Sequence, residues 1–198
     1  MLFESYIHDF IGFFPSSRRK KEKAELRSLL EQKRRILTTE EVTKASNEVI
    51  EQILQSNHFW QAHTILIYYP IHNEINLLPL LTNRDISDKR FLMPVTHRNG
   101  LELREYVGEE NLKKGKYGIP EPQTPAYKGK VDLMLIPGVG FDRSLHRMGR
   151  GKGYYDRLLK NWGKAWKVGI AYHFQLLDSI PHTRHDKKMN QIITAKSK

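Results

Sequence analysis

The sequence predicts an α/β fold, in which a mainly parallel sheet is covered by helices on both faces. Short apolar runs rich in β-branched residues alternate along the chain with stretches of helical spacing, which is the pattern of βαβ units. The strongest run, residues 131–136, is apolar except for Asp132, as strands buried on both faces largely are. The length of 198 residues and the hydrophobic fraction of 39% fit one domain with a buried core.

Two helices are expected before the first strand. Leucines and isoleucines recur at helical spacing among charged residues over 16–37, which predicts an amphipathic helix. Thr38 and Thr39 precede Glu41, so we expect a second helix that is capped by a threonine hydroxyl and ends near residue 55. These N-terminal helices precede all of the expected strands.

The remaining elements follow from short apolar runs and from the glycines and prolines that end them. Short helices are expected at 75–81 and 153–161, and residues 111–127, rich in Gly, Pro and Lys, are expected to form an ordered loop. The segment 101–107 alternates polar and apolar residues, which is typical of an edge strand. The expected strands are residues 64–69, 91–95, 101–107, 131–136, 167–171 and 191–194.

Residues 1–15 stand apart from this pattern. The segment is apolar and aromatic, but it carries two acidic residues and lacks the basic start and the cleavage site of a secretory signal. We interpret it as a poorly packed extension or as a short helix that docks on the body or on a partner, with membrane docking as the alternative. The predicted single domain therefore covers residues 16–198.

The net charge of +11 is concentrated in three basic windows of the sequence. Residues 16–35, 143–167 and 184–198 carry +6, +7 and +4, which leaves −6 for the rest of the chain. A uniformly basic chain would favour a nucleic-acid coat, whereas separate basic windows favour converging walls of a site for a polyanionic ligand. A basic RNA-binding protein is the alternative from another functional class.

The composition excludes several classes of site. The chain has no cysteine, which excludes a disulfide scaffold, a thiol nucleophile and a Cys-ligated metal, and which fits a cytoplasmic location. The nine histidines show no spacing typical of zinc ligands, so no zinc is expected. No apolar run approaches the roughly 18 residues of a membrane-spanning helix, so we expect no membrane partner.

The segment that follows the strongest strand has the composition of a phosphate-binding loop. Alternating glycines let backbone N–H groups approach a ligand, and a helix that begins near residue 153 presents its positive end to an anion. A single acid, Asp156, stands among the cations, where it could hold Mg²⁺ against phosphates. The alternative is a glycine-rich turn with a solvated basic face. The loop residues are Arg147, Gly149, Arg150, Gly151, Lys152 and Gly153.

Three other segments each have a functional and a plain structural interpretation. Glu74 follows an expected strand, where it accepts hydrogen bonds from an N–H-rich heterocycle or interacts with a helix N-terminus. Lys23 and Arg27 share one helix face and either close over an anion or are solvated. Asp186 either completes a metal site with Asp156 or lies in a surface loop.

Taken together and in this order, these segments resemble the 5-formyltetrahydrofolate cyclo-ligases, also called methenyltetrahydrofolate synthetases, over residues 20–195. Leu145 stands where the family often has glycine, and Met148 where it has Leu or Ile, which we interpret as local repacking. The resemblance implies a three-layer α/β/α fold similar to that of sugar-phosphate isomerases and CoA-transferases. The motifs that carry it are Tyr69-Pro70, Asn73-Glu74-Ile75, Gly118-Ile119-Pro120-Glu121-Pro122, Pro137-Gly138-Val139-Gly140-Phe141-Asp142, Arg147-Met148-Gly149-Arg150-Gly151-Lys152-Gly153-Tyr154-Tyr155-Asp156-Arg157 and His185-Asp186.

The activity implied by the resemblance is the ATP- and Mg²⁺-dependent closure of 5-formyltetrahydrofolate to 5,10-methenyltetrahydrofolate, with release of ADP and phosphate. The implied route phosphorylates the formyl oxygen to give an iminium phosphate, which N10 of the folate then attacks. The implied partner is the folate, with or without a polyglutamate tail, and no nucleic acid is expected. A family member that has diverged to another ATP-dependent folate or small-molecule reaction is a further alternative.

The resemblance also implies a role for each matched residue. Lys152, Arg150 and Tyr154 are implied to be catalytic, and Asp156 and Asp186 to hold Mg²⁺. The implied nucleotide contacts are Lys23, Arg27, Arg147, Gly149, Arg150, Gly151, Lys152, Gly153, Tyr154 and Tyr155. The implied folate contacts are Arg27, Tyr69, Glu74, Arg150, Gly151, Lys152, Gly153 and Tyr154. Of these, the phosphate loop and Asp156 are also reached from the residue types themselves.

Overall fold

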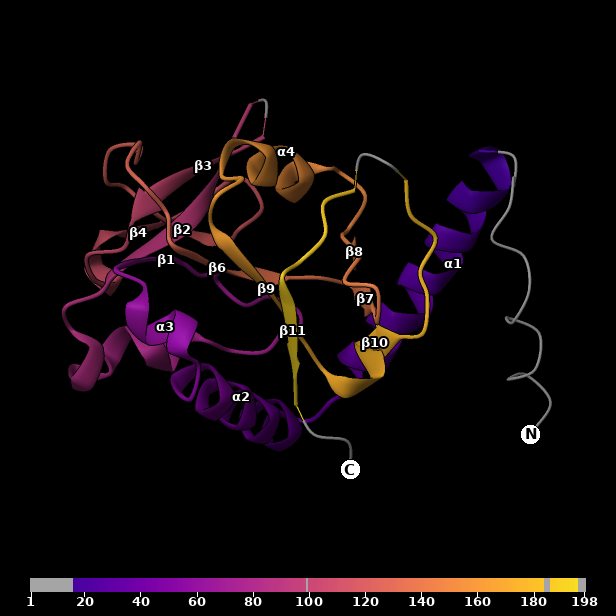
Figure 1. Cartoon of the computed structure of the whole chain (residues 1–198), viewed down its shortest axis with the longest axis horizontal. Helices are drawn as coiled ribbons and strands as arrows, with labels where there is room; N and C mark the ends of the chain where they lie inside the picture. The colour runs from indigo at the N-terminus through magenta and orange to yellow at the C-terminus, as the bar shows by residue number, and fades with distance from the viewer. Residues whose placement is uncertain (1–15, 99, 184–185, 196–198) are drawn as a thin grey trace.

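The computed structural model describes residues 16–98, 100–183 and 186–195, and it is built on a central six-stranded sheet (Figure 1). The strand order across this sheet is β11-β9-β6-β1-β2-β3. Neighbouring strands are parallel except β2 and β3, which are antiparallel at one edge. The strands are β1 (Thr64–Leu66), β2 (Arg90–His97), β3 (Gly100–Glu105), β6 (Leu133–Pro137), β9 (Trp166–Ala171) and β11 (Gln191–Thr194). The predicted α/β fold with a mainly parallel sheet is confirmed.

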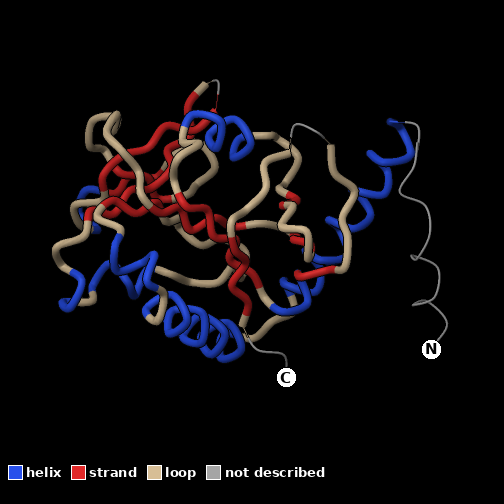
Figure 2. Tube along the Cα trace, viewed as in Figure 1, coloured by secondary structure: helices blue, strands red, loops and turns tan. Residues whose placement is uncertain are grey.

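Helices cover both faces of the sheet. Helices α2 (Thr39–Leu54) and α3 (Asn57–Gln61) lie on one face, and α4 (Tyr154–Asn161) lies on the other (Figure 1, Figure 2). Neighbouring residues of β1 show this division, because Ile65 packs in the apolar cluster of α2 and Leu66 in that of α4. Both faces of the central strands are buried, which is why their sequences are apolar throughout rather than alternating.

A smaller sheet extends the fold beyond the carboxyl end of β6. Helix α1 (Ser16–Arg35) packs against it, so the first basic window lies beside the segment between β6 and α4. The strands of this sheet, in spatial order, are β10 (Leu176–Leu177), β7 (Gly140–Asp142) and β8 (Arg147–Met148). The buried apolar residues at the contact are Leu30, Val139, Met148 and Ile180.

A hairpin stands beside β2 and completes the arrangement. It consists of β4 (Leu112–Lys114) and β5 (Pro120–Pro122), which are antiparallel. The buried Glu121 accepts the backbone N–H of Thr96 at 2.9 Å, and this hydrogen bond ties the hairpin to β2. The short helices of the 3₁₀ type are Leu78–Thr82, Arg84–Ile86, Glu109–Asn111 and His173–Gln175.

The elements differ from the prediction where they are shortest. The ordered loop expected at 111–127 is wrong in part, because it contains the hairpin, and the Pro-Glu-Pro of β5 has no strand-like pattern. The helix expected at 75–81 is a 3₁₀ helix that begins at Leu78, whose N–H bonds the Asn76 side chain. Strand β1 pairs over Thr64–Leu66 rather than over 64–69, since the chain then leaves the sheet.

Two predictions concern the ends of the chain and the membrane. Residues 1–15, expected to be an extension, lie outside the described residues, so the division into an extension and one domain stays a prediction. Among the helices of residues 16–98, 100–183 and 186–195, none has the length and apolar character that crossing a bilayer requires.

The start of α2 is held by a reciprocal cap, and removing it should destabilise the fold. Thr38 Oγ1 accepts the N–H of Glu41 at 3.2 Å, and Glu41 Oε2 accepts the N–H of Thr38 at 3.0 Å. We expect Thr38→Ala to lower the free energy of unfolding by about 1 kcal/mol, measured by urea denaturation. Thr43→Ala is the control, because that hydroxyl donates within the exposed helix to Thr39 O. Equal losses in the two variants would contradict a stabilising cap.

Candidate functional site

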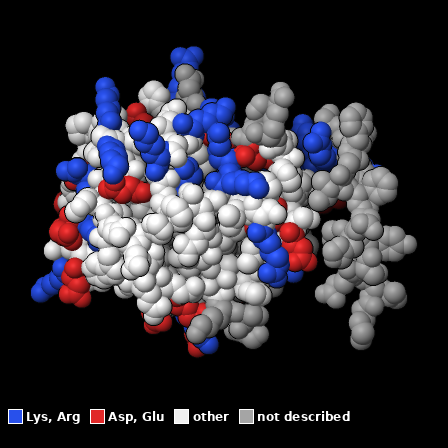
Figure 3. Space-filling view, in the orientation of Figure 1, with Lys and Arg blue, Asp and Glu red and all other residues white. Residues whose placement is uncertain are grey.

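A cavity of about 960 Å³ opens at the carboxyl ends of β1, β2 and β6. Its walls come from α1, the turn after β1, the hairpin β4–β5 and the loop between β8 and α4. This edge of an open parallel sheet is where ligands usually bind. Figure 3 shows Lys and Arg side chains gathered along the upper part of the molecule, in the region of α4. The residues predicted for the site all line this cavity, namely Lys23, Arg27, Tyr69, Glu74, Arg147, Gly149, Arg150, Gly151, Lys152, Gly153, Tyr154, Tyr155, Asp156 and Asp186.

The loop between β8 and α4 depends on its glycines. Gly151 has a φ of 96° and Gly153 a φ of 64°, a region that costs most other residues about 1–2 kcal/mol. A Cβ on Gly149 would lie 2.8 Å from the Arg147 guanidinium, so a side chain there would displace that guanidinium. Arg27 Nε, from α1, donates to Gly149 O at 2.8 Å. The predicted phosphate loop is therefore fixed from two sides at the N-terminus of α4.

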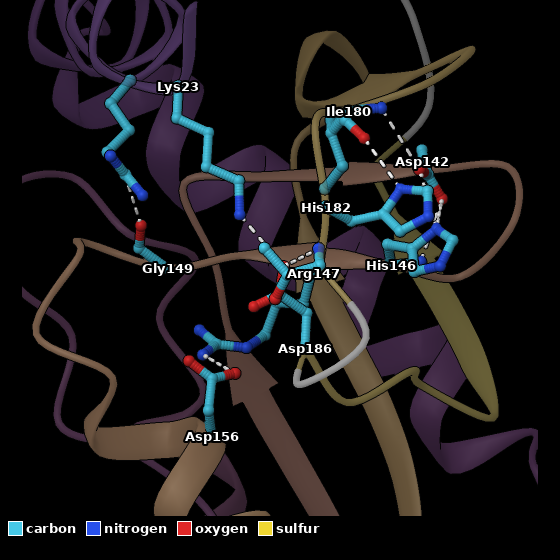
Figure 4. A network of polar contacts seen from close by, with 11 residues as sticks. Lys23, Asp142, His146, Arg147, Gly149, Asp156, Ile180, His182 and Asp186 are labelled. Carbon is cyan, nitrogen blue, oxygen red and sulfur yellow. Dashed lines mark hydrogen bonds and ion pairs between the residues drawn. The ribbon is translucent and has the colours of Figure 1, made fainter. Parts of the chain in front are cut away.

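The cations of this loop have different surroundings. Arg147 is 6% exposed, donates to Pro137 O at 3.2 Å and pairs with Asp156 at 3.4 Å (Figure 4). Arg150 and Lys152 are exposed and line the cavity. The structure thus places Arg147 below the loop, where it fixes Asp156, and leaves Arg150 and Lys152 accessible to a ligand.

Glu74 joins α1 to the phosphate loop. Its Oε1 accepts Arg150 Nη2 at 3.0 Å and lies 3.5 Å from Arg34 Nη1, while its Oε2 accepts the N–H of Ile71 at 3.2 Å. Burial lowers the pKa of Arg34, and the Glu74 carboxylate opposes that shift. Glu74 is 9% and Arg34 2% exposed, and Arg34 Nε has no hydrogen-bond partner among the described residues. The two buried charges therefore depend on each other.

Arg34 is a site residue that the sequence interpretation missed. It lies seven residues after Arg27, two helical turns away, and Lys23 lies four residues before Arg27. This repeated spacing was the available signal, because it places all three cations on one face of α1. The turn that carries Glu74 is anchored to the same helix end, since Asn73 Nδ2 donates to Leu37 O at 3.0 Å.

Tyrosines surround Glu74 and keep this wall neutral. Burial, followed by the nearby Glu74 charge, raises the pKa of Tyr155 and of Tyr68 well above the ordinary value. Tyr69, predicted to contact a folate, is half-buried and lines the cavity beside them. A wall of neutral rings with one carboxylate suits a flat heterocycle that carries N–H groups.

Two carboxylates lie on the phosphate side of the cavity. Asp186 Oδ2 accepts Lys23 Nζ at 3.0 Å and the N–H of Thr183 at 2.8 Å, and Asp156 pairs with Arg147 (Figure 4). Partial burial raises the pKa of Asp186, but the hydrogen bonds from Lys23 and Thr183 outweigh it, and the net shift is downward. Both acids offer the oxygen donors that Mg²⁺ prefers, so they fit the predicted metal role.

A cluster of Asp142, His146 and His182 lies on β7, on the turn after it and on the segment before Asp186, and it was not predicted. Its potential ligand atoms lie within 4.8 Å of one another, although the sequence spacing suggested no metal site. The two imidazoles stack at 3.6 Å with an interplanar angle of 12°, and His146 Nδ1 lies 3.1 Å from Asp142 Oδ2. Asp142 also accepts the N–H groups of His146 and Ile180. The cluster therefore ties the loop that leads to Asp186 onto β7.

Leu145 adopts the backbone conformation of the glycine that it replaces. Its φ is 69°, in the left-handed region, and its side chain is partly buried against the apolar cluster of α4. Met148 is buried against Leu30 of α1. Both departures from the family pattern thus have packing partners, in agreement with local repacking.

The match to known proteins covers nearly the whole chain. A model of the 5-formyltetrahydrofolate cyclo-ligase family matches residues 19–195. The chain belongs to this family. The cyclo-ligase of Escherichia coli strain K12 is 27% identical over 175 residues, which cover 84% of this chain and 96% of that protein. The cyclo-ligase of Mycolicibacterium smegmatis is 30% identical over 184 residues, which cover 88% of this chain and 94% of that protein.

Solved structures of cyclo-ligases share the fold. The Aquifex aeolicus 5,10-methenyltetrahydrofolate synthetase has a TM-score of 0.79 at 34% identity and covers 88% of this chain and 90% of its own. The Mycoplasma pneumoniae synthetase has a TM-score of 0.71 at 27% identity and covers 88% of this chain and 99% of its own. The predicted family and enzyme class are confirmed, and the RNA-binding alternative is not favoured.

The Arg34–Glu74 pair of this cyclo-ligase family member should be energetically coupled. We expect Glu74→Gln to lower the free energy of unfolding by about 3 kcal/mol, because the buried Arg34 guanidinium loses its carboxylate. Adding Arg34→Met should recover most of that loss, since no buried cation is then left unpaired. Urea unfolding of both single variants and the double variant completes the cycle. Additive losses would show that the two side chains are independent.

Proposed function

We propose that the cavity binds ATP and 5-formyltetrahydrofolate side by side, and that the enzyme closes the folate to 5,10-methenyltetrahydrofolate with release of ADP and phosphate. The chain belongs to a family named for this ligase. The observation that carries the proposal is the 3.0 Å contact between Glu74 and Arg150. It joins the wall suited to a pterin to the phosphate loop, so ligands on its two sides lie close enough to react.

The proposed chemistry needs alignment and charge neutralisation rather than a covalent nucleophile. The formyl group is amide-like and a poor electrophile. Its oxygen therefore first takes the γ-phosphoryl group of ATP, and the bond from that phosphorus to ADP breaks. N10 then forms a bond to the formyl carbon and loses its proton, and phosphate leaves with the former formyl oxygen.

Lys152, Arg150 and Tyr154 are the proposed catalytic residues. Arg150 and Lys152 are exposed to the cavity from the phosphate loop, and fixed cations there stabilise charge on the transferring phosphoryl group. Lys23 and Arg27 add positive charge from α1 and are proposed to contact the nucleotide, with Arg27 also near the folate. The remaining loop residues from Arg147 to Tyr155 are proposed to shape the nucleotide site.

Glu74 and Tyr69 are the proposed pterin contacts. The Glu74 carboxylate accepts one side-chain and one backbone donor in the structure, and a pterin presents N–H donors of the same kind. Exposed lysines on the neighbouring hairpin, Lys113, Lys114 and Lys116, suit the carboxylates of a polyglutamate tail. The absence of cysteine fits the cytoplasmic location that we propose.

Asp156 and Asp186 are the residues proposed to hold Mg²⁺. When bound, the ion would neutralise phosphate charge and orient the γ-phosphoryl group. Lys23 and Arg147 pair with these two acids, so each cation holds its carboxylate toward the phosphate side of the cavity.

The reaction itself is tested by absorbance, because methenyltetrahydrofolate absorbs near-ultraviolet light and the formyl substrate does not. Folded protein mixed with 5-formyltetrahydrofolate, Mg²⁺ and ATP should give rising absorbance, and the same mixture without ATP should not. Unchanged absorbance in the complete mixture would contradict the proposed function.

The metal role is tested by Asp156→Asn. We expect the Mg²⁺ concentration for half-maximal turnover to rise about 10-fold, because a neutral amide is a weaker ligand than a carboxylate. Asp178→Asn is the matched control, since Asp178 also pairs with an arginine but is exposed and lies outside the cavity. Circular dichroism should show the same folded state for both variants. Wild-type turnover of Asp156→Asn at limiting Mg²⁺ would rule the role out.

A further inference from the structure

The tip of the hairpin β4–β5 reaches the phosphate loop. Tyr117, at this tip, accepts a hydrogen bond from Lys152 Nζ at 3.0 Å, and its hydroxyl shares a second one with the Tyr154 hydroxyl at 3.1 Å. The Lys152 ammonium also lies 4.1 Å from the centroid of the Tyr117 ring. One tyrosine from a separate element thus contacts two of the proposed catalytic residues.

The hairpin tip is built so that Tyr117 has a defined place. The N–H of Gly118 donates to Gly115 O at 3.0 Å, which closes a tight turn, and Gly118 has a φ of 73° that glycine adopts without strain. A Cβ on Gly115 would collide with the Glu121 carboxylate, so the base of the turn is closely packed. Glu121 in turn bonds the backbone of β2. The tip is therefore supported by the central sheet.

The contact with Tyr117 also favours the protonated form of Lys152 and restricts the position of its ammonium group. The hydrogen bond to Tyr117 raises the pKa of Lys152, and the hydrogen bonds with Lys152 and Tyr154 lower the pKa of Tyr117. A lysine side chain has about 2 kcal/mol of rotamer entropy, so an exposed ammonium without a partner is spread over many positions. Tyr117 limits those positions through both its hydroxyl and its ring.

We propose that Tyr117 is a positioning residue, whose ring and hydroxyl hold the Lys152 ammonium in the cavity for phosphoryl transfer. This inference rests on the proposed function and on the role of Lys152 in it. Charge stabilises a transition state best when the cation is in place before the reaction. We therefore expect Tyr117 to affect turnover with ATP more than folate affinity, because the proposed pterin contacts Glu74 and Tyr69 lie at another wall.

The test is a double-mutant cycle of Tyr117→Phe and Lys152→Met, measured by product absorbance. Tyr117→Phe keeps the ring and removes the hydroxyl, so we expect kcat to fall about 5-fold, with a smaller change in KM for 5-formyltetrahydrofolate and an unchanged thermal unfolding temperature. Tyr117→Leu also removes the ring and should lower kcat further. In the Lys152→Met background, which lacks the cation, Tyr117→Phe should have no additional effect.

Tyr127→Phe is the matched control. It also removes one tyrosine hydroxyl, which donates to Lys130 O at 3.0 Å outside the cavity, and it should keep wild-type kcat. Unchanged kcat in Tyr117→Phe, or the same loss with and without Lys152, would overturn the positioning role and leave the ligase activity standing. Wild-type turnover in Lys152→Met would overturn the positioning role too. An inactive unmodified enzyme would overturn both this role and the proposed function.

Discussion

The carboxylate of Glu74 lies between two guanidinium groups that differ in solvent exposure. Arg34 comes from the end of α1 with a side chain that is 3% exposed, and Arg150 comes from the phosphate loop with a side chain that is 38% exposed. Leaving one member of such a buried pair unpaired costs several kcal/mol. Helix α1, the turn that carries Glu74 and the phosphate loop are distant in the sequence and must therefore pack together. This packing shapes the cavity.

The same logic explains how so many cations share one cavity. Three of the cations that line it pair with acids: Lys23 with Asp186, Arg147 with Asp156, and Arg150 with Glu74. These pairs, together with the hydrogen bond from Arg27 to Gly149, join all three basic windows of the sequence. The charge pattern that predicted converging walls for a polyanion thus has a direct structural counterpart.

The fold was largely predictable because its main elements have strong patterns. Helices α1 and α2 have helical spacing with a cap, and the central strands are apolar runs ended by Pro or Gly. Strands β7, β8 and β10 have two or three residues, and β5 is Pro-Glu-Pro, so no periodicity could reveal them. Their pairing is decided by tertiary contacts rather than by local preference.

The site was predictable where its chemistry is local in the sequence. The phosphate loop and Asp156 could be found from residue types alone, whereas Lys23, Arg27, Glu74 and Asp186 depended on the family resemblance. Arg34 and Tyr117 were missed, because their importance comes from partners that only folding supplies. Tyr117 and Lys152, for example, are 35 residues apart. The stacked histidines His146 and His182 were missed for the same reason.

One face of helix α1 runs along the cavity. Lys23, Arg27 and Arg34 contact Asp186, Gly149 and Glu74 in turn, so one helix face reaches a proposed Mg²⁺ ligand, the phosphate loop and a proposed pterin contact. At a rise of 1.5 Å per residue, Lys23 and Arg34 are about 16 Å apart along the helix axis. A single inserted residue between Arg27 and Arg34 would rotate Arg34 by about 100° and remove it from that face. The length of this helix is therefore as constrained as the identity of its charges.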